Sequence, residues 1–165
     1  MSTAKERVLE REYNAARALA APIGKADAEA LQLAAPDMTG TELNGAAGRI
    51  PMFTEAVKIK NMMERPVGFV CLSSARRVVK LLQPYDSTIY QQEPEVLPAQ
   101  WGFVWSDDPA HARPYISLST SPYMIGNVCT VGLDIFRSRI DNNVWSPLDY
   151  EQGWEWVGNV LDYQA

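Results

Sequence analysis

An internal repeat in the second half of the chain constrains the fold more than any other feature. Segments 66–71 and 124–129 each place a cysteine three residues after a glycine. A β-prone run, a polar turn and a closing aromatic segment follow in both copies, at 101–104 and 154–157. Self-similarity of this kind is typical of a structural unit that occurs twice. The order predicts strand, turn, strand, looped segment and short strand in each copy.

Tryptophan supplies much of the area that these units can bury. Each copy spans roughly 35 to 40 residues, which is near the lower limit for a core without metals or disulfides. Trp101 and Trp154 close the two copies, so we expect both in the core. Trp105 and Trp156 alternate with their strand neighbours and are expected to face outward, or to pack against the other copy.

The two cysteines occupy matched positions in the copies. We expect Cys71 and Cys129 to be buried free thiols, because buried cysteine behaves as a small hydrophobic residue. The chain has one histidine and no Cys-x-x-Cys pair, which argues against a metal or redox site. We therefore expect no metal and no cofactor.

The charged residues of the repeat region give no catalytic pattern. Asp107 and Asp108 are adjacent, and neighbours on an extended chain face opposite sides, so we interpret them as the start of a helical turn before Pro109. His111 has no nucleophile beside it in the sequence. These observations predict no catalytic residues and no enzyme activity. A basic cluster is interpreted as a solvated strand edge and consists of Arg76, Arg77 and Lys80.

The first 60 residues differ in character, because they are rich in alanine and hold equal numbers of basic and acidic side chains. They predict a helix over 4–20 that ends at Pro22 and Gly24, and a second over 27–35. Thr39 and Glu42 have the spacing of a capping box. The first helix carries a narrow apolar stripe made of Val8, Leu9, Tyr13, Ala16, Leu19 and Ala20. This stripe packs either against another chain or against the β-rich region.

The predicted fold class is therefore α+β, with a short helical N-terminal segment followed by two small antiparallel β modules in tandem. The expected boundaries are 1–60 for a helical anchoring segment and 61–106 for the first module. The second module, with a linker and a C-terminal tail, is expected over 107–165.

Charge and hydropathy exclude several functional classes. The 165 residues carry a formal charge of −5 and a pI near 4.9, whereas binding to nucleic acid or anionic lipid needs a basic face. No apolar run approaches the ~20 residues that span a bilayer. The first dozen residues are charged and lack the apolar core of a signal peptide. We therefore expect no nucleic acid, no membrane insertion and no ordinary secretory route.

The second copy resembles a known family. Its segment 123–128, an aromatic residue at Phe136, the Trp145-Ser146-Pro147 motif and Trp154 are similar to the chitin-binding type 3 domain, carbohydrate-binding module family 5/12. In that family an exposed tryptophan precedes a core tryptophan by about nine residues, as Trp145 precedes Trp154 here.

The first copy matches less fully. It shares the motif through Gly68-Phe69-Val70, the turn 83–87 and Trp101. Counted back from Trp101, the exposed position falls on Gln92, which has no ring, although Tyr90 could substitute. A helical segment ahead of two such modules also resembles the layout of phage tail-region proteins that bind carbohydrate.

The resemblance implies a non-enzymatic carbohydrate-binding structural protein of a phage virion, in the tail or host-contact apparatus. Such a protein would recognise cell-surface glycans, assemble in the host cytoplasm and lie exposed on the particle. Its N-terminal helices would contact other virion structural proteins, in a homo-oligomer. The alternative is a purely architectural virion protein that decorates the capsid or bridges tail subunits. The candidate sugar-contacting residues are Trp145, Tyr150, Trp156, Tyr90 and Tyr85.

Overall fold

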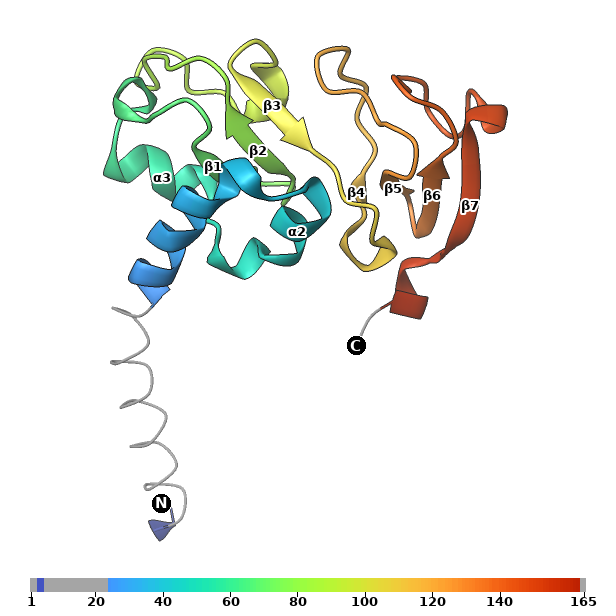
Figure 1. The fold of residues 1–165 in the computed structure, drawn as a ribbon, viewed down its shortest axis with the longest axis horizontal. Coiled ribbons are helices and arrows are strands. Elements are labelled where there is room, and N and C mark those ends of the chain that lie inside the picture. Colours follow the sequence, from blue (N-terminus) through green and yellow to red (C-terminus); the bar gives the residue numbers. More distant parts are fainter. Residues whose placement is uncertain (1–2, 5–23, 164–165) are drawn as a thin grey trace.

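Two small sheets lie side by side, with the helical region beside the first (Figure 1). This computed structural model describes residues 3, 4 and 24–163. The first sheet contains β1 (Val70–Leu72), β2 (Val78–Leu81) and β3 (Trp101–Val104). The second contains β4 (Arg113–Pro114), β5 (Val128–Val131), β6 (Asp134–Ser138) and β7 (Trp154–Asn159). Neighbouring strands are antiparallel except the short β4, which pairs in parallel with β5. The predicted α+β fold with two β modules after a helical region is confirmed.

Short helices precede and connect the strands. Residues 24–34 are helical, close to the predicted 27–35, and α2 (Gly40–Gly45) and α3 (Phe53–Ile59) follow. The capping box is confirmed, because the Thr39 side chain accepts from Glu42 N while the Glu42 side chain accepts from Thr39 N. The 3-10 turns are η1 (Ala35–Asp37), η2 (Ala47–Arg49), η3 (Met62–Glu64), η4 (Pro94–Val96), η5 (Pro109–His111), η6 (Glu151–Gly153) and η7 (Val160–Tyr163).

The apolar stripe of the predicted first helix lies outside the described residues. Within 24–163, no helix is long and apolar enough to cross a bilayer. The helix at 24–34 is tied to the edge of the first sheet, since Gln32 accepts from Val70 N at 3.0 Å and donates to Val70 O at 2.8 Å. These bonds satisfy polar groups on the open side of β1, where an exposed edge would favour unwanted pairing.

The hydrogen bonds of the sheets confirm that the two modules are copies of one unit. Gly68 N donates to Leu81 O at 2.7 Å, and Gly126 N donates to Ser138 O at 3.0 Å. Both glycines have a positive φ, 92° and 95°, a conformation that costs glycine little. The repeated Gly and Cys spacing therefore reflects the same tight turn into β1 and into β5.

The first sheet is buried on both faces. Val70, Leu72 and Val78 pack against the helical region, including Leu31 and Leu43. The opposite face forms a second core cluster that reaches α3 on one side and the second module on the other. The largest members of this cluster are Phe53, Phe69, Tyr85, Trp101, Phe103, Trp105, Tyr123 and Trp154. Both modules thus share one core.

Four tryptophans lie in or next to the closing strands: two are core residues, one packs between the modules and one lies at the surface. Trp101 and Trp154 are buried, as predicted. Trp105 packs against the other module: its ring stacks on Tyr123 with centroids 4.3 Å apart, and its Nε1 donates to Ser121 O at 3.0 Å. Trp156 faces outward.

One residue of the basic cluster is buried, which corrects the expectation of a solvated strand edge. Arg77 Nη1 lies 3.0 Å from Glu95 Oε1, and both side chains are largely buried. Its Nε and Nη2 donate to Pro114 O at 3.1 and 2.8 Å. Because Pro114 belongs to β4, the guanidinium connects the first module to the second. Arg76, in contrast, is exposed.

Both cysteines are free and buried, as predicted. Removal from water disfavours the thiolate, so burial raises the pKa of both thiols, that of Cys129 to about 12. An unfolded thiol titrates near 9. Above that pH the unfolded chain releases protons that the folded protein retains.

We expect the free energy of unfolding to fall as the pH rises above 9, by about 1.4 kcal/mol per pH unit for each thiol. Urea unfolding at pH 8 and pH 10 measures the loss. Cys129→Ala should show a smaller loss between these two values. An unchanged loss in this variant would show that other groups cause the dependence.

Candidate functional site

A tight turn in the second module brings two aromatic rings together. The Ser146 carbonyl accepts hydrogen bonds from Asp149 N at 3.0 Å and from Tyr150 N at 2.9 Å. The turn places the rings of Trp145 and Tyr150 with their centroids 5.5 Å apart and tilted by 54°. Trp145 is 52% exposed and Tyr150 is 37% exposed. The two residues therefore form an aromatic pair that is open to solvent.

The main chain, and not the ring, holds Trp145 in place. Trp154, in the core, donates its Nε1 hydrogen bond to the Trp145 carbonyl at 2.8 Å. The Trp145 amide donates to Asn143 Oδ1 at 3.3 Å, and the fully buried Asn143 donates its Nδ2 to Gly153 O at 3.1 Å. A core residue thus positions the backbone of a surface residue and leaves the surface ring available.

Gly153 makes room for Tyr150. A Cβ atom at Gly153 would lie 2.5 Å from Cδ1 of the Tyr150 ring and 3.2 Å from Asn143 Nδ2. Any side chain here would displace the ring, so the glycine is required by this close approach. The corresponding position of the first module is Gln100, because Leu82 N donates to Gln100 O as Arg139 N donates to Gly153 O.

A groove lies beside this loop. Its lining residues are Phe136, Pro147, Leu148, Glu151, Trp154 and Trp156. Trp156 is 60% exposed, and its Nε1 donates to Asp134 Oδ1 at 3.1 Å, which fixes the edge of its ring. Neither Trp145 nor Tyr150 lines this groove, so the Trp145–Tyr150 pair and the Trp156 groove are two distinct aromatic surfaces beside the loop.

The indole N–H groups distinguish Trp145 from the other four tryptophans. Trp101, Trp105, Trp154 and Trp156 all donate hydrogen bonds within the protein. Trp145 Nε1 has no hydrogen-bond partner among residues 24–163. The Trp145 ring therefore offers both an apolar face and an available donor.

The first module has an equivalent loop, and its hydrogen bonds identify which residues correspond to Trp145 and Tyr150. The Asp86 carbonyl accepts from Ile89 N at 3.2 Å and Tyr90 N at 3.0 Å, as the Ser146 carbonyl does in the second module. Tyr85 therefore corresponds to Trp145, and Tyr90 corresponds to Tyr150. The assignment of Gln92 to the Trp145 position was wrong, because the first module holds extra residues, including η4, between this loop and its closing strand.

The first module does not present an open aromatic pair. Tyr85 is only 6% exposed, and its hydroxyl accepts the Trp101 Nε1 hydrogen bond at 3.0 Å. The expectation that Tyr85 contacts sugar is thus wrong, since its ring belongs to the core. Tyr90 remains exposed, without an exposed ring at the Trp145 position beside it.

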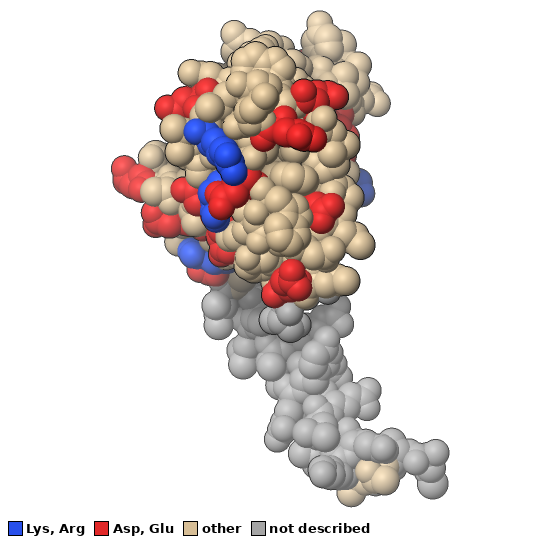
Figure 2. Space-filling model, turned by 90° about the vertical axis from the view of Figure 1, so that its right-hand side faces the viewer, with Lys and Arg blue, Asp and Glu red and all other residues tan. Residues whose placement is uncertain are grey.

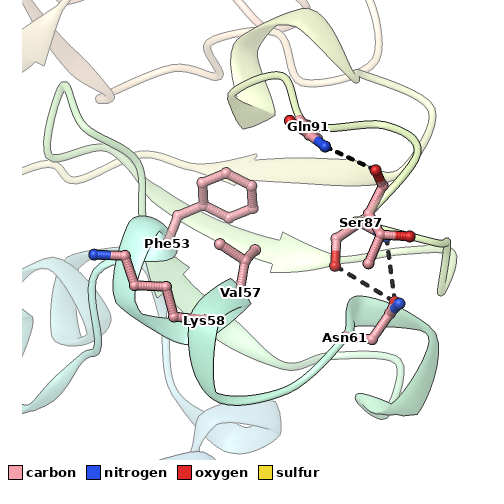
Figure 3. Close-up of a pocket in the computed structure, with 7 residues that line it drawn as sticks. Phe53, Val57, Lys58, Asn61, Ser87 and Gln91 are labelled. Atoms are coloured by element: carbon pink, nitrogen blue, oxygen red, sulfur yellow. Dashed lines mark hydrogen bonds between the residues drawn. The ribbon is translucent and has the colours of Figure 1, made fainter.

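Helix α3 packs on the core tryptophan of the first module, beside the equivalent loop. Phe53 meets the Trp101 ring edge-on, with centroids 5.7 Å apart and an interplanar angle of 88°. Figure 3 shows Phe53 and Val57 of α3 lining a pocket together with Ser87 of the loop. Ser87 N donates to Asn61 Oδ1 at 3.2 Å, which ties the loop to the end of the helical region. Phe53 of α3 therefore covers the Trp101 indole, while a pocket remains between α3 and the loop.

Acidic side chains outnumber basic ones in the second module. Residues 107–163 contain eight Asp and Glu and three Arg. Figure 2 faces the side of the molecule where β7 lies and shows acidic residues scattered among uncharged ones, with few basic residues. Such a surface repels anions and favours uncharged or cationic ligands.

The adjacent carboxylates have structural partners. Asp108 caps η5, as expected for the start of a helical turn, by accepting from Ala110 N at 3.0 Å. Asp107 Oδ1 accepts from Asn127 Nδ2 at 2.9 Å. Within the described chain, no group of three His, Cys, Asp or Glu side chains is arranged to hold a metal ion.

Comparison with protein-family models, curated proteins and solved structures finds no match. The candidate site is therefore defined by the internal comparison of the two modules. Trp145 and Tyr150 are in contact as an open pair, Trp156 lines the groove beside the loop, and Tyr85 and Tyr90 belong to the first module. The sequence did not predict a role for Asn143, Leu148 or Gly153 in this site, although a glycine directly before the closing tryptophan was a usable signal.

Proposed function

We propose that the protein is a non-enzymatic carbohydrate-binding structural protein in which Trp145 and Tyr150 contact the sugar. An exposed indole face can stack on the apolar C–H face of a pyranose. The observation that carries the proposal is the hydrogen bond from Trp154 to the Trp145 carbonyl, which fixes the backbone of a residue whose ring is exposed at the surface. A ring on a fixed backbone that also contacts Tyr150 has less conformational freedom to lose when a ligand binds. Trp156 extends the aromatic surface on the other side of the loop.

The proposed setting is a phage virion, in its tail or host-contact apparatus, with cell-surface glycans as ligands. The sequence resemblance to tandem chitin-binding type 3 modules supports this setting. One aromatic pair in one of the two modules gives weak binding to a single sugar chain. Many copies on one particle would strengthen it by avidity, which fits a virion component better than a free binding protein.

A purely architectural role is the second candidate. Leu148 and Trp156 are exposed beside the groove, and apolar side chains gathered on a surface are typical of protein–protein contacts. In that role a neighbouring virion protein, and not a sugar, would cover the Trp145–Tyr150 pair.

Binding of the Trp145→Ala variant to a glycan array distinguishes the carbohydrate-binding role from the architectural role. We expect the variant to lose about 5- to 150-fold in affinity, as for an aromatic anchor worth about 1–3 kcal/mol. The melting temperature should change little, because alanine keeps the carbonyl that accepts from Trp154. Tyr90→Ala, at the equivalent of Tyr150 in the first module, is the matched control and should bind as the wild type does.

Three results would contradict the proposal. They are unchanged binding by Trp145→Ala, equal loss in Tyr90→Ala, and a wild-type protein that binds no glycan on the array. The last result, together with coverage of Trp145 by a neighbouring chain in assembled particles, would establish the architectural role instead.

A further inference from the structure

The Trp156 groove combines aromatic side chains with a single carboxylate. Phe136 lies opposite Trp156 across β6 and β7, and Trp154 lies two residues before Trp156, so the three rings share one face of the sheet. Glu151 of η6 is the one charged residue among the described residues that line this groove. The groove has a volume of about 260 Å³, which is below the range of pockets that take drug-sized ligands. It therefore suits one small ring or a single side chain.

Trp156 offers the largest exposed aromatic surface of this groove. Its side chain is 60% exposed, whereas Trp154 is 4% exposed. The hydrogen bond from Trp156 Nε1 to Asp134 Oδ1 engages the edge of the indole, so the face of the ring remains available. The face of an indole is apolar and carries partial negative charge, and it therefore attracts cations as well as C–H groups.

The carboxylate of Glu151 has no counterion in the described chain. No ion pair or hydrogen bond joins it to residues 24–163, and none of the three arginines of 107–163 lines the groove. Arg137 instead donates to the main-chain oxygens of Gly126 and Asp107. An unpaired carboxylate beside an aromatic face attracts positive charge. Charge complementarity thus favours a cationic group on an apolar framework.

We propose that the Trp156 groove binds a sugar unit that carries a protonated amine, such as glucosamine in a deacetylated glycan. The pyranose stacks on the Trp156 ring, and its ammonium group donates to the Glu151 carboxylate. This inference rests on the proposed carbohydrate-binding function and adds to it a ligand class and a residue, Glu151, that selects the ligand. An N-acetylated sugar has the same ring without the charge, and so it gains from stacking alone.

Two observations favour a sugar over a lysine side chain as the occupant. The groove and the exposed Trp145–Tyr150 pair lie beside the same loop, which gives successive units of one glycan two aromatic surfaces. A pyranose is also rigid, whereas a lysine side chain loses much rotamer freedom when it is held in place. The ring covers more of the indole face at a lower entropic cost.

Calorimetric titration of the full chain compares two probes that differ in charge, chitosan tetrasaccharide with free amines and chitin tetrasaccharide with N-acetyl groups. At about pH 6 the amines of the first probe carry protons. We expect the wild type to bind this probe about two- to fivefold more tightly than the second, as for one exposed charge pair. Glu151→Gln should abolish the preference, measured as the ratio of the two Kd values. A wild type without the preference, or a Glu151→Gln variant that retains it, would overturn the proposal.

Glu155→Gln is the matched control. Glu155 is exposed on the same strand as Trp156, but neighbours along a strand face opposite sides, and Glu155 does not line the groove. Removal of the same charge at this position should leave the preference intact. Equal loss in Glu151→Gln and Glu155→Gln would overturn the proposal, because the overall negative charge of the protein would then attract the amines.

A tetralysine peptide that is blocked at both ends carries the same number of amines without sugar rings. We expect it to bind more weakly than chitosan tetrasaccharide. Equally tight binding that both Glu151→Gln and Trp156→Ala weaken would overturn the proposal, because the groove would then accept a basic segment of a protein partner.

The indole N–H signals of ¹⁵N-labelled protein distinguish failure of this inference from failure of the proposed function. We expect chitosan tetrasaccharide to shift the Trp156 signal, and to shift it less in Glu151→Gln. If the Trp145 signal moves and the Trp156 signal stays in place, the Trp145–Tyr150 pair binds sugar and the inference is overturned. If the Trp156 signal moves and the Trp145 signal does not, the groove binds the amino sugar and the assignment of the Trp145–Tyr150 pair is wrong.

Discussion

Trp154→Ala should lower the free energy of unfolding by about 3–5 kcal/mol, as large truncations in a core do. Trp154 is 4% exposed. Its ring packs edge-on against Tyr115 and Tyr123, with centroids 6.2 and 5.3 Å away. The change would leave a cavity in the core that both modules share and would remove the hydrogen bond to the Trp145 carbonyl. Urea unfolding followed by circular dichroism measures the loss.

Trp156→Ala is the matched control, because Trp156 lies on the same strand and is mostly exposed. It should cost less than about 1 kcal/mol. If Trp154→Ala prevents folding, Trp154→Phe retains an aromatic ring and removes only the donor and part of the volume, with an expected cost of about 1–2 kcal/mol. Equal stability of Trp154→Ala and Trp156→Ala would contradict the assignment of Trp154 to the core.

Arg77→Met should destabilise the protein by about 3–5 kcal/mol, because removal of one partner leaves the largely buried Glu95 carboxylate uncompensated. The variant keeps an unbranched apolar side chain, so the loss would come from charge and hydrogen bonding more than from volume. The Pro114 carbonyl would also lose both of its donors from this side chain.

Arg76→Met tests the specificity of that effect. The two arginines are neighbours in the sequence, but Arg76 is exposed. Its replacement should change the free energy of unfolding by less than about 0.5 kcal/mol. Similar losses for both variants, measured by urea unfolding, would show that the contact between Arg77, Glu95 and Pro114 does not join the modules.

The parts of the fold that depend on local pattern could be predicted from the sequence. The spacing of Gly68 and Gly126 from their cysteines predicted two copies of one unit, and the structure gives both glycines the same positive φ. Thr39 and Glu42 predicted their capping box because its residues are three apart. The closing positions of Trp101 and Trp154 predicted their burial.

The parts that depend on long-range contacts could not be predicted. An insertion of unknown length in the first module shifted the alignment from Tyr85 to Gln92. Nothing local indicates that Phe53, about 50 residues before Trp101, closes that module. Arg77 was interpreted as solvated because Pro114, its acceptor, is distant in sequence. Periodicity shows which residues share a face, whereas it does not show what covers that face.

The comparison of the modules explains why the candidate site occurs once. In the first module, Tyr85 turns inward to Trp101, and Phe53 of α3 packs on the same indole. In the second module, the Trp154 indole donates to a carbonyl, and the Trp145 ring stays outside. The same loop therefore serves as a core element in one copy and as an open surface in the other.

The most direct test is a titration of ¹⁵N-labelled protein with chitin tetrasaccharide, followed through the five tryptophan indole N–H signals. We predict that the Trp145 signal, assigned by its absence from Trp145→Phe, shifts progressively with ligand, because this N–H is available and its ring forms the contact. The Trp101 and Trp105 signals should stay in place, since their donors are buried and hydrogen-bonded. A Trp145 signal that does not move at saturating ligand, or a larger shift at Trp101, would contradict the assignment of sugar binding to the open loop of the second module.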